Sequence, residues 1–154
     1  MTFLKSRLAS GRVETSHITT AIHGAPFTVG NGGSAAIYHL SEDTISSHNF
    51  ANGLVVSGNA SVTGNGSIAG TVTVASGGTL SPGSSIGKFS LNNQPVLQGR
   101  VVMEIGKNGS TLTNDFIEVN GNLNYGGSLT VSNLGPNSLA SGNSFKLFHS
   151  VNSY

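Results

Sequence analysis

Short apolar groups separated by glycine-rich turns dominate the chain from residue 52 onward. Leu54-Val55-Val56 is followed by Ser57-Gly58, and Thr71-Val72-Thr73-Val74 is followed, after one residue, by Ser76-Gly77-Gly78. Apolar and small polar residues alternate within most of these groups, as they do in a strand with one buried face. No stretch has the i, i+3, i+4, i+7 apolar spacing of an amphipathic helix. The pattern therefore predicts an all-β chain of short strands.

The predicted strands divide the chain into three parts. Two predicted strands, Phe27–Val29 and Ala36–Leu40, precede the regular pattern that begins at residue 52. Longer candidates follow in the second half, at Arg100–Ile105, Asp115–Val119, Ser128–Val131 and Ser144–His149. We therefore predict a poorly defined N-terminal segment over residues 1–26, a repeat region over 27–150 and a truncated end at 151–154.

Strands this short favour a right-handed parallel β-helix, or β-solenoid. An isolated hairpin of such strands is marginal in water, whereas each strand of a β-helix pairs with the same strand of the next coil, about 4.8 Å away. Glycine suits the turns because it adopts positive φ freely, and asparagine tolerates that conformation too. A repeat of about 20–25 residues predicts about six or seven coils. A β-sandwich stays open as an alternative, although sandwiches usually have longer alternating strands.

Two internal similarities are consistent with such a repeat. Gly58–Val62 resembles Gly121–Tyr125 in form, and Gly70–Val74 resembles Gly127–Val131.

Composition excludes several classes of protein. Charged residues make up 8% of the 154-residue chain, against about 25% in a typical domain. Disorder throughout is disfavoured, because it usually requires a high net charge and the formal net charge here is +1. Nucleic acid is an unsuitable partner, because phosphate binding needs clustered Lys and Arg. The chain has seven such residues, and three of them, Lys5, Arg7 and Arg12, lie near its N-terminus.

The chain also lacks cysteine, which excludes disulfides, thiolate metal sites and cysteine nucleophiles. No apolar run reaches the roughly 18 residues of a membrane-spanning helix. Met1–Arg7 is not followed by an apolar core, so it is not a recognisable signal peptide. We therefore expect a chain that does not span a membrane, and an export signal outside it if the parent protein is exported.

The segment Gly77–Gly87 is specific enough to suggest a family. Its sequence is Gly-Gly-Thr-Leu-Ser-Pro-Gly-Ser-Ser-Ile-Gly. It resembles the core of the autotransporter-associated β-strand repeat (passenger-associated repeat), which reads G-G-T-L-x-P-G-x-S-x-G. Asn114–Gly121 is similar to the later D-x-[ILV]-x-V-x-G element of that family, and Tyr125–Val131 to its G-G-x-L-x-V element. The resemblance covers roughly residues 52–150.

The resemblance implies a β-helical stalk in the passenger region of a secreted or surface-displayed bacterial protein. It therefore implies an extracellular or cell-surface location and adjoining β-helix coils of a longer parent protein. The chain departs from the family in having no signal peptide, no outer-membrane barrel pattern and no clear cap at residues 151–154. We expect it to be a fragment or a truncated reading frame.

The same motif singles out a set of structural turn residues. Ser81–Ser84 fits a type II turn, because Pro82 fixes its own φ and Gly83 supplies the positive φ that this turn requires. The predicted turn-motif residues are Gly77, Gly78, Thr79, Leu80, Pro82, Gly83, Gly87, Gly126 and Gly127.

Candidate catalytic carboxylates are few. Glu104 and Glu118 are expected to face outward from neighbouring strands, and a carboxylate pair can serve a glycosidase. Only Arg100 and Lys107 are near enough in sequence to assist them. Solubilising charges on an exposed face are therefore the simpler explanation.

The five histidines do not form a metal-binding motif. None of them belongs to an H-x-x-x-H or H-x-H pair, and only His39 has acidic residues nearby, at Glu42 and Asp43. The others are His17, His23, His48 and His149. We predict surface histidines, and neither a metal nor a cofactor.

The sequence as a whole predicts a structural or adhesive module with no catalysis of its own. Outward faces rich in Ser, Thr and Asn suit weak multivalent contact with glycans or with host and environmental surfaces. The alternative is a fragment of a carbohydrate-active β-helix enzyme, a polysaccharide lyase or hydrolase, if Glu104, Glu118 and Arg100 meet in one groove. A third hypothesis is a non-functional remnant of a repeat array, whose exposed end coils would aggregate.

Overall fold

Every regular element that the structure describes is a β-strand. The computed structural model describes residues 12–15, 26–30, 36–40 and 47–151. None of these residues is helical, so the prediction of an all-β chain is confirmed. In this part of the chain there is accordingly no helix long and apolar enough to cross a membrane. Most of the N-terminal segment 1–26, and residues 152–154 of the predicted truncated end, lie outside the described residues.

The strands form three sheets, which we call A, B and C. Sheet A contains β1 (Arg12–Thr15), β3 (Ala36–Leu40), β6 (Ala60–Gly64), β9 (Thr79–Pro82), β12 (Arg100–Asn108), β13 (Thr111–Asn114) and β16 (Ser128–Asn133). Sheet B contains β4 (Ser47–Asn49), β7 (Gly66–Ala69), β10 (Lys88–Leu91), β14 (Phe116–Val119) and β17 (Phe148–Ser150). Sheet C contains β2 (Phe27–Val29), β5 (Leu54–Val56), β8 (Val72–Val74), β11 (Val96–Leu97) and β15 (Asn124–Tyr125). All paired strands are parallel except β12 and β13, which form an antiparallel hairpin.

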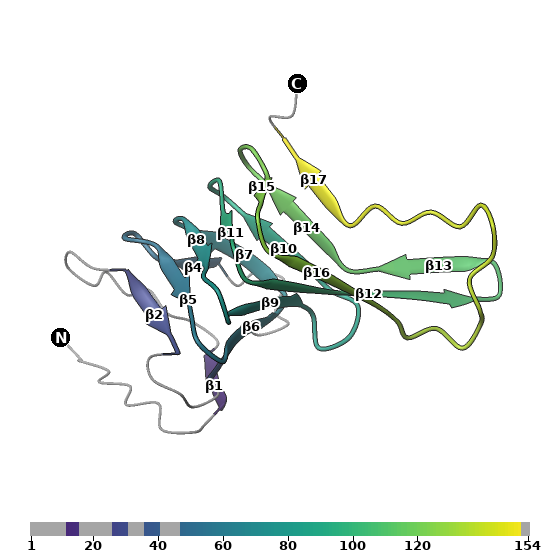
Figure 1. Ribbon diagram of the computed structural model, residues 1–154, viewed down its shortest axis with the longest axis horizontal. Helices are drawn as coiled ribbons and strands as arrows, with labels where there is room; N and C mark the ends of the chain where they lie inside the picture. The colour runs from purple at the N-terminus through teal and green to yellow at the C-terminus, as the bar shows by residue number, and fades with distance from the viewer. Residues whose placement is uncertain (1–11, 16–25, 31–35, 41–46, 152–154) are drawn as a thin grey trace.

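Successive strands belong to the three sheets in a fixed order, and we call one passage of the chain through all three sheets a rotation. From β2 onward the order is C, A, B, and the β12–β13 hairpin is the one interruption in the described part of the chain. Each strand therefore pairs with the strand reached one rotation later, and Figure 1 shows the resulting rows of stacked arrows.

The rotations differ in length. Paired residues lie 18 positions apart between β5 and β8, where Leu54 pairs with Val72. They lie 31 positions apart between β14 and β17, where Ile117 pairs with Phe148. The repeat is thus less regular than the predicted 20–25 residues. Within the described ranges sheets B and C have five strands each and sheet A has six parallel strands, against six or seven predicted coils.

Inward-facing residues of the three sheets form one core. Alternation places Val, Leu and Ile on the same face of successive strands, where they stack in register. In sheet A the column is Val62, Leu80 and Val101, in sheet B it is Ile68, Leu91 and Val119, and in sheet C it is Val56, Val74 and Leu97. All nine side chains are buried and belong to a single cluster, so the three sheets share one core.

Three aromatic rings fill the N-terminal end of the described core. The centroids of Phe27, Tyr38 and Phe50 lie 5.4 to 6.0 Å apart, in edge-to-face or tilted arrangements. Such ring pairs add stabilisation beyond the area that they bury. Phe27 comes from sheet C and Tyr38 from sheet A, so the cluster connects two sheets.

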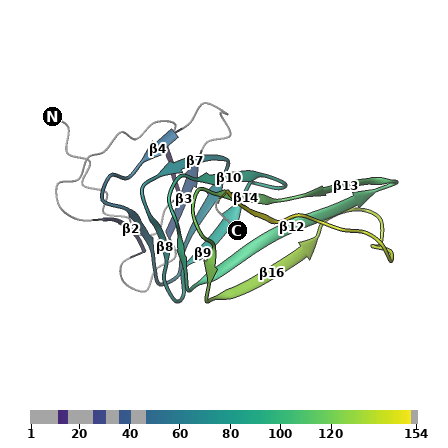
Figure 2. The same ribbon diagram turned by 90° about the horizontal axis from the view of Figure 1, so that it is seen from above.

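The β12–β13 hairpin extends beyond the stacked strands. β12 has nine residues, of which the first two pair with β9 and the last four with β13. Figures 1 and 2 both show the hairpin projecting from the body, with the connection between β16 and β17 running beside it. The N–H of Leu134 donates to the carbonyl of Ile105, and the N–H of Asn137 to that of Lys107. These bonds fasten the connection to the hairpin and account for the long rotation that precedes β17.

The internally similar segments lie in different sheets. Gly58–Val62 leads into β6 of sheet A, whereas Gly121–Tyr125 leads into β15 of sheet C. Gly70–Val74 contains β8 of sheet C, whereas Gly127–Val131 contains β16 of sheet A. The similarity reflects the same glycine-then-strand chemistry at different corners, because every strand of the fold needs the same local pattern.

The buried columns predict that the loss of stability caused by truncating a leucine depends strongly on its position. Leu80→Ala should lower the free energy of unfolding by about 2–5 kcal/mol, because it opens a cavity in a fully buried column. Leu129→Ala is the matched control, since Leu129 pairs with Val101 of the same column but is 44% exposed. It should cost about 1 kcal/mol or less. Chemical denaturation followed by circular dichroism measures the free energy of unfolding of both variants. Equal losses would contradict the assignment of Leu80 to a buried column.

Candidate functional site

Glycines occupy the corner through which the chain passes from sheet C to sheet A. Gly78, Gly99 and Gly127 lie at this corner in successive rotations. The N–H of Arg100 donates to the carbonyl of Gly78 at 2.9 Å, and that of Ser128 to the carbonyl of Gly99 at 3.0 Å, so the corners stack directly. A Cβ on Gly99 would overlap the carbonyl oxygen of Gly78, and one on Gly127 would overlap that of Gly99. Steric contact between rotations therefore requires bare backbone here.

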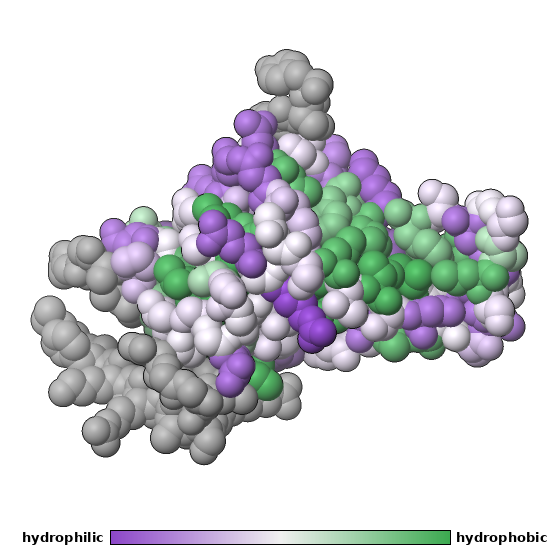
Figure 3. All heavy atoms as spheres, in the orientation of Figure 1, coloured by the Kyte–Doolittle hydropathy of each residue, from purple (hydrophilic) through white to green (hydrophobic). Residues whose placement is uncertain are grey.

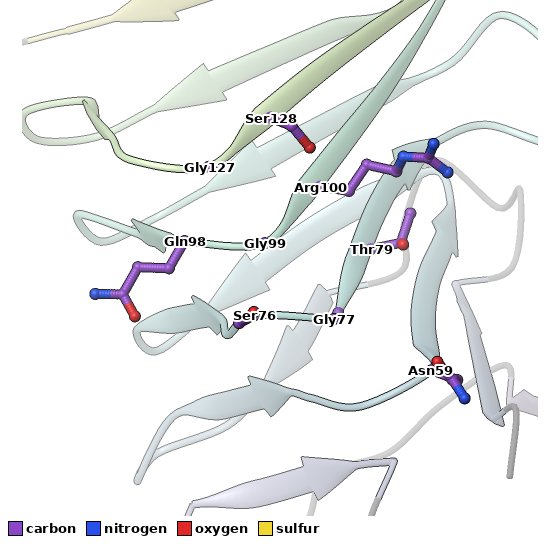
Figure 4. A pocket seen from close by; sticks show the side chains of 10 residues that line it. Asn59, Ser76, Gly77, Thr79, Gln98, Gly99, Arg100, Gly127 and Ser128 are labelled. Carbon is purple, nitrogen blue, oxygen red and sulfur yellow. The ribbon is translucent and has the colours of Figure 1, made fainter. Parts of the chain in front are cut away.

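An open groove of about 630 Å³ lies along this corner (Figure 4), and we call it the corner groove. Its lining consists of glycines and polar side chains only: Asn59, Ser76, Gly77, Gly78, Thr79, Gln98, Gly99, Arg100, Gly127 and Ser128. Part of the predicted turn motif, namely Gly77, Gly78, Thr79 and Gly127, is therefore brought together here. Gly126 precedes the groove, and its N–H donates to the carbonyl of Leu97 at 2.9 Å.

Three polar side chains form a row along the corner groove. Arg100 pairs in register with Thr79 of β9 and with Ser128 of β16. In-register residues of parallel strands share a face, and Figure 4 shows these side chains on the outer side of sheet A. Leu80, which follows Thr79, points the other way and is fully buried in the core.

Arg100 is the one cation of the groove. Its side chain is exposed, and no hydrogen bond or ion pair of its guanidinium occurs within the described ranges. No acidic residue of the described part of the chain lines the groove. The site therefore offers an unpaired guanidinium next to hydroxyl, amide and backbone groups.

The Pro-Gly part of the motif ends β9. Pro82 is the last residue of that strand, and Gly83 has a φ of +79°, as its place in the predicted turn requires. Gly83 and Gly64 exchange two backbone hydrogen bonds, at 2.5 and 3.1 Å. The chain bends over Ser84–Ile86, whereas the sequence predicted the turn across Ser81–Ser84. The bend comes later because Pro82 still belongs to the strand.

Asp115 connects this bend to the hairpin. Its Oδ1 accepts a hydrogen bond from the N–H of Gly87, and its Oδ2 accepts one from the N–H of Glu104, both at 2.7 Å. Its own N–H donates to the carbonyl of Glu104 at 2.8 Å. It is the one fully buried charged side chain in the part of the chain that the structure describes. Burial raises the pKa of the Asp115 carboxyl, although the two backbone N–H groups oppose that shift.

The structure places the two candidate carboxylates on different sheets. Glu104 lies on β12 of sheet A, where its Oε2 is buried without a hydrogen-bond partner. Glu118 lies on β14 of sheet B, 2.8 Å from the Nζ of Lys88 and 3.6 Å from the Nδ1 of His149. The hydrogen bond from Lys88 lowers the pKa of Glu118. Arg100 shares a strand with Glu104, but neither carboxylate lines its groove.

The histidines are similarly dispersed. The Nδ1 of His39 is 2.8 Å from the Oγ1 of Thr63. The ring of His149 stacks on that of Phe116, with centroids 6.5 Å apart. His17, His23 and the acidic pair Glu42 and Asp43 lie outside the described residues, as does the side chain of His48. Within the residues described, no three His, Asp or Glu side chains are grouped so that they could hold a metal ion.

Sequence reasoning included the corner glycines but missed the groove and the junction at Asp115. Gln98 and Gly99 belong to no motif, and Ser128 fills an unspecified position of one. These residues meet only because residues from four successive corners stack. The signal for Asp115 was its place as the acid of the D-x-[ILV]-x-V-x-G element, at the first position of a predicted strand, and that signal does not indicate its hydrogen-bond partners. No known protein family, curated protein or solved structure matches this chain.

The bend after β9 predicts a large cost for a side chain at Gly83. Gly83→Val should lower the free energy of unfolding by more than about 1 kcal/mol, because it combines a strained φ with overlap on the Ser85 carbonyl. Gly109→Val separates the two effects, since Gly109 also has positive φ but has no atom within 4 Å of a Cβ. Denaturant titration should give the larger loss at Gly83, and a neutral Gly83→Val would show that the bend assignment is wrong.

The junction at Asp115 predicts a pH-dependent stability effect. Asp115→Asn replaces the carboxyl group with an uncharged amide of the same shape, so it removes the titration and keeps one oxygen acceptor for the two buried N–H groups. The raised pKa of Asp115 means that the folded state binds its proton more tightly than the unfolded state does. Its contribution is thus complete below the ordinary pKa of about 3.9 and is lost as the pH rises through the folded value. The stability of the wild type relative to that of the variant should therefore fall from acid to neutral pH.

The substitution Glu118→Gln tests a pH dependence of stability with the opposite sign. The lowered pKa of Glu118 gives a contribution that is present above its ordinary pKa and disappears as the pH falls through the folded value. Unfolding titrations of both variants from acid to neutral pH measure the two slopes. Slopes of the same sign would contradict the assigned environments.

Proposed function

We propose that this chain is a structural segment of a right-handed parallel β-helix, acting as a stalk with an adhesive surface and without catalysis of its own. The parent is proposed to be an autotransporter-like bacterial protein that is secreted or displayed at the cell surface. The observation that supports the proposal best is the rotation of the chain through three parallel sheets around one core. A rotation of this kind extends indefinitely by adding coils, as a stalk requires.

The C-terminal side of the stack supports an adjoining coil as partner. Leu129 and Val131 of β16 pair in register with the core residues Val101 and Met103, yet each is 44% exposed. Figure 3 shows apolar surface between the stacked strands and the projecting hairpin. One further coil stacked on β16 would bury these side chains as the preceding coils bury theirs. We therefore propose adjoining coils of a longer parent protein as the main contact of this segment.

The positions of the family-like residues also support the proposal. Gly77 and Gly78 stand at the C-to-A corner, where neighbouring coils approach too closely for a Cβ, and Gly83 begins the bend toward sheet B. Asp115, the acid of the later family element, ties that bend to β12. Each of these residues thus has a role in stacking one coil on the next, which is the role that a structural repeat needs.

The enzyme alternative has less support. It requires Glu104, Glu118 and Arg100 to meet in one groove, but the carboxylates belong to different sheets and only Arg100 lines the corner groove. Depolymerisation of a polysaccharide panel that is abolished by Glu104→Gln would favour it over the stalk.

Surface display tests the proposal. We expect the whole chain, fused between an export signal and the outer-membrane barrel of an autotransporter, to reach the cell surface as a protease-resistant segment. Leu80→Asp should be degraded, because it puts a charge into the buried column. Ile86→Asp is the control, since Ile86 is 38% exposed in the bend. If the unsubstituted chain is degraded on cells although it is folded when purified, the proposed stalk role is contradicted.

A further inference from the structure

The chemistry of the corner groove restricts what it can bind. Its walls present the hydroxyls of Ser76, Thr79 and Ser128, the amide of Gln98 and the guanidinium of Arg100, and its floor is glycine backbone. No apolar or aromatic side chain lines it. A folded partner protein would leave these groups without the apolar contacts that the centre of an interface needs. A polyhydroxylated ligand can satisfy them by hydrogen bonds.

The groove is also repetitive along its length. Thr79, Arg100 and Ser128 belong to three neighbouring strands of sheet A. Adjacent strands are about 4.8 Å apart, so a polar side chain is offered at each step. Such a surface suits an extended chain of similar units better than a compact small molecule.

Arg100 adds a requirement for negative charge. A guanidinium presents its N–H donors as a planar fork that matches a carboxylate. The guanidinium of Arg100 has no such partner among the described residues, and no acid lines the groove to neutralise it. A single cation is too little for nucleic acid, which needs clustered positive charge. It is sufficient for one carboxylate of a sugar chain.

We infer that the corner groove binds an acidic polysaccharide chain, with the carboxylate of a uronic acid unit on Arg100 and sugar hydroxyls on Thr79, Gln98 and Ser128. The inference rests on the proposed adhesive stalk and locates its adhesive surface. Binding to one groove is weak, because no aromatic ring stacks on the sugar and hydrogen bonds replace those to water. Affinity at a cell surface then comes from many copies acting together.

Titration with a uronic acid oligosaccharide tests the inference on the full chain. The probe is an oligogalacturonate, compared with its carboxyl-reduced, neutral counterpart, and backbone amide shifts in nuclear magnetic resonance spectra are the readout. We expect the acidic probe to shift the amides of Gly78, Gly99 and Gly127 with a dissociation constant of about 1 mM or below. The neutral probe should bind roughly ten-fold more weakly.

Two variants distinguish the groove from general charge attraction. Arg100→Ala should weaken binding of the acidic probe roughly ten-fold and remove its preference over the neutral probe. Lys107→Ala is the matched control, because Lys107 lies on the same strand and carries the same charge but does not line the groove. It should leave binding unchanged.

The outcomes separate this inference from the stalk itself. Equal binding of both probes, or equal weakening by Arg100→Ala and Lys107→Ala, would overturn the assignment of Arg100. Absence of binding by a folded chain would overturn the inference, while protease-resistant display of that chain would still support the stalk. Failure of display would instead count against the stalk, whatever the groove binds.

Discussion

Stacking of buried side chains between successive strands is the interaction on which the rest of this structure depends. Each strand has only two to nine residues, too few to form a stable pair alone. Its inward residues meet equivalent residues above and below, as Leu80 does between Val62 and Val101. Removal of apolar surface from water then accumulates along the three columns. Because no sheet has a core of its own, the three sheets are stable only together.

The same stacking produces the corner groove. Neighbouring rotations approach so closely at the C-to-A corner that Gly99 and Gly127 have no room for a Cβ. Bare backbone leaves a hollow, and the outward residues beside it, Thr79, Arg100 and Ser128, become its polar wall. A steric requirement of the fold thus generates a concave hydrogen-bonding surface without any residue being dedicated to it. The adhesive function that we propose for this chain would need little beyond the choice of outward side chains.

Asp115 shows how an irregular element is attached to a regular stack. The hairpin interrupts the rotation of the chain through the sheets, so backbone groups near its base lose their ordinary partners. The carboxylate of Asp115 accepts hydrogen bonds from two of them, on Gly87 and Glu104, and thereby joins the bend after β9 to β12. Burying a carboxylate is costly. The two N–H donors offset part of that cost, and the raised pKa of Asp115 shows that burial outweighs them.

The sequence by itself determined the strand chemistry: alternation over Leu54–Val56 and Val72–Val74 and glycine between them are local signals, and they predicted the all-β class and the short strands. Tertiary structure alone decided which strands are equivalent, because pairing across 18 to 31 residues depends on the lengths of the intervening bends, and no local pattern encodes them. For that reason Gly58–Val62 and Gly121–Tyr125 lie in different sheets although they are similar in form. The corner groove and the junction at Asp115 have the same origin, since both join residues that only stacking brings together.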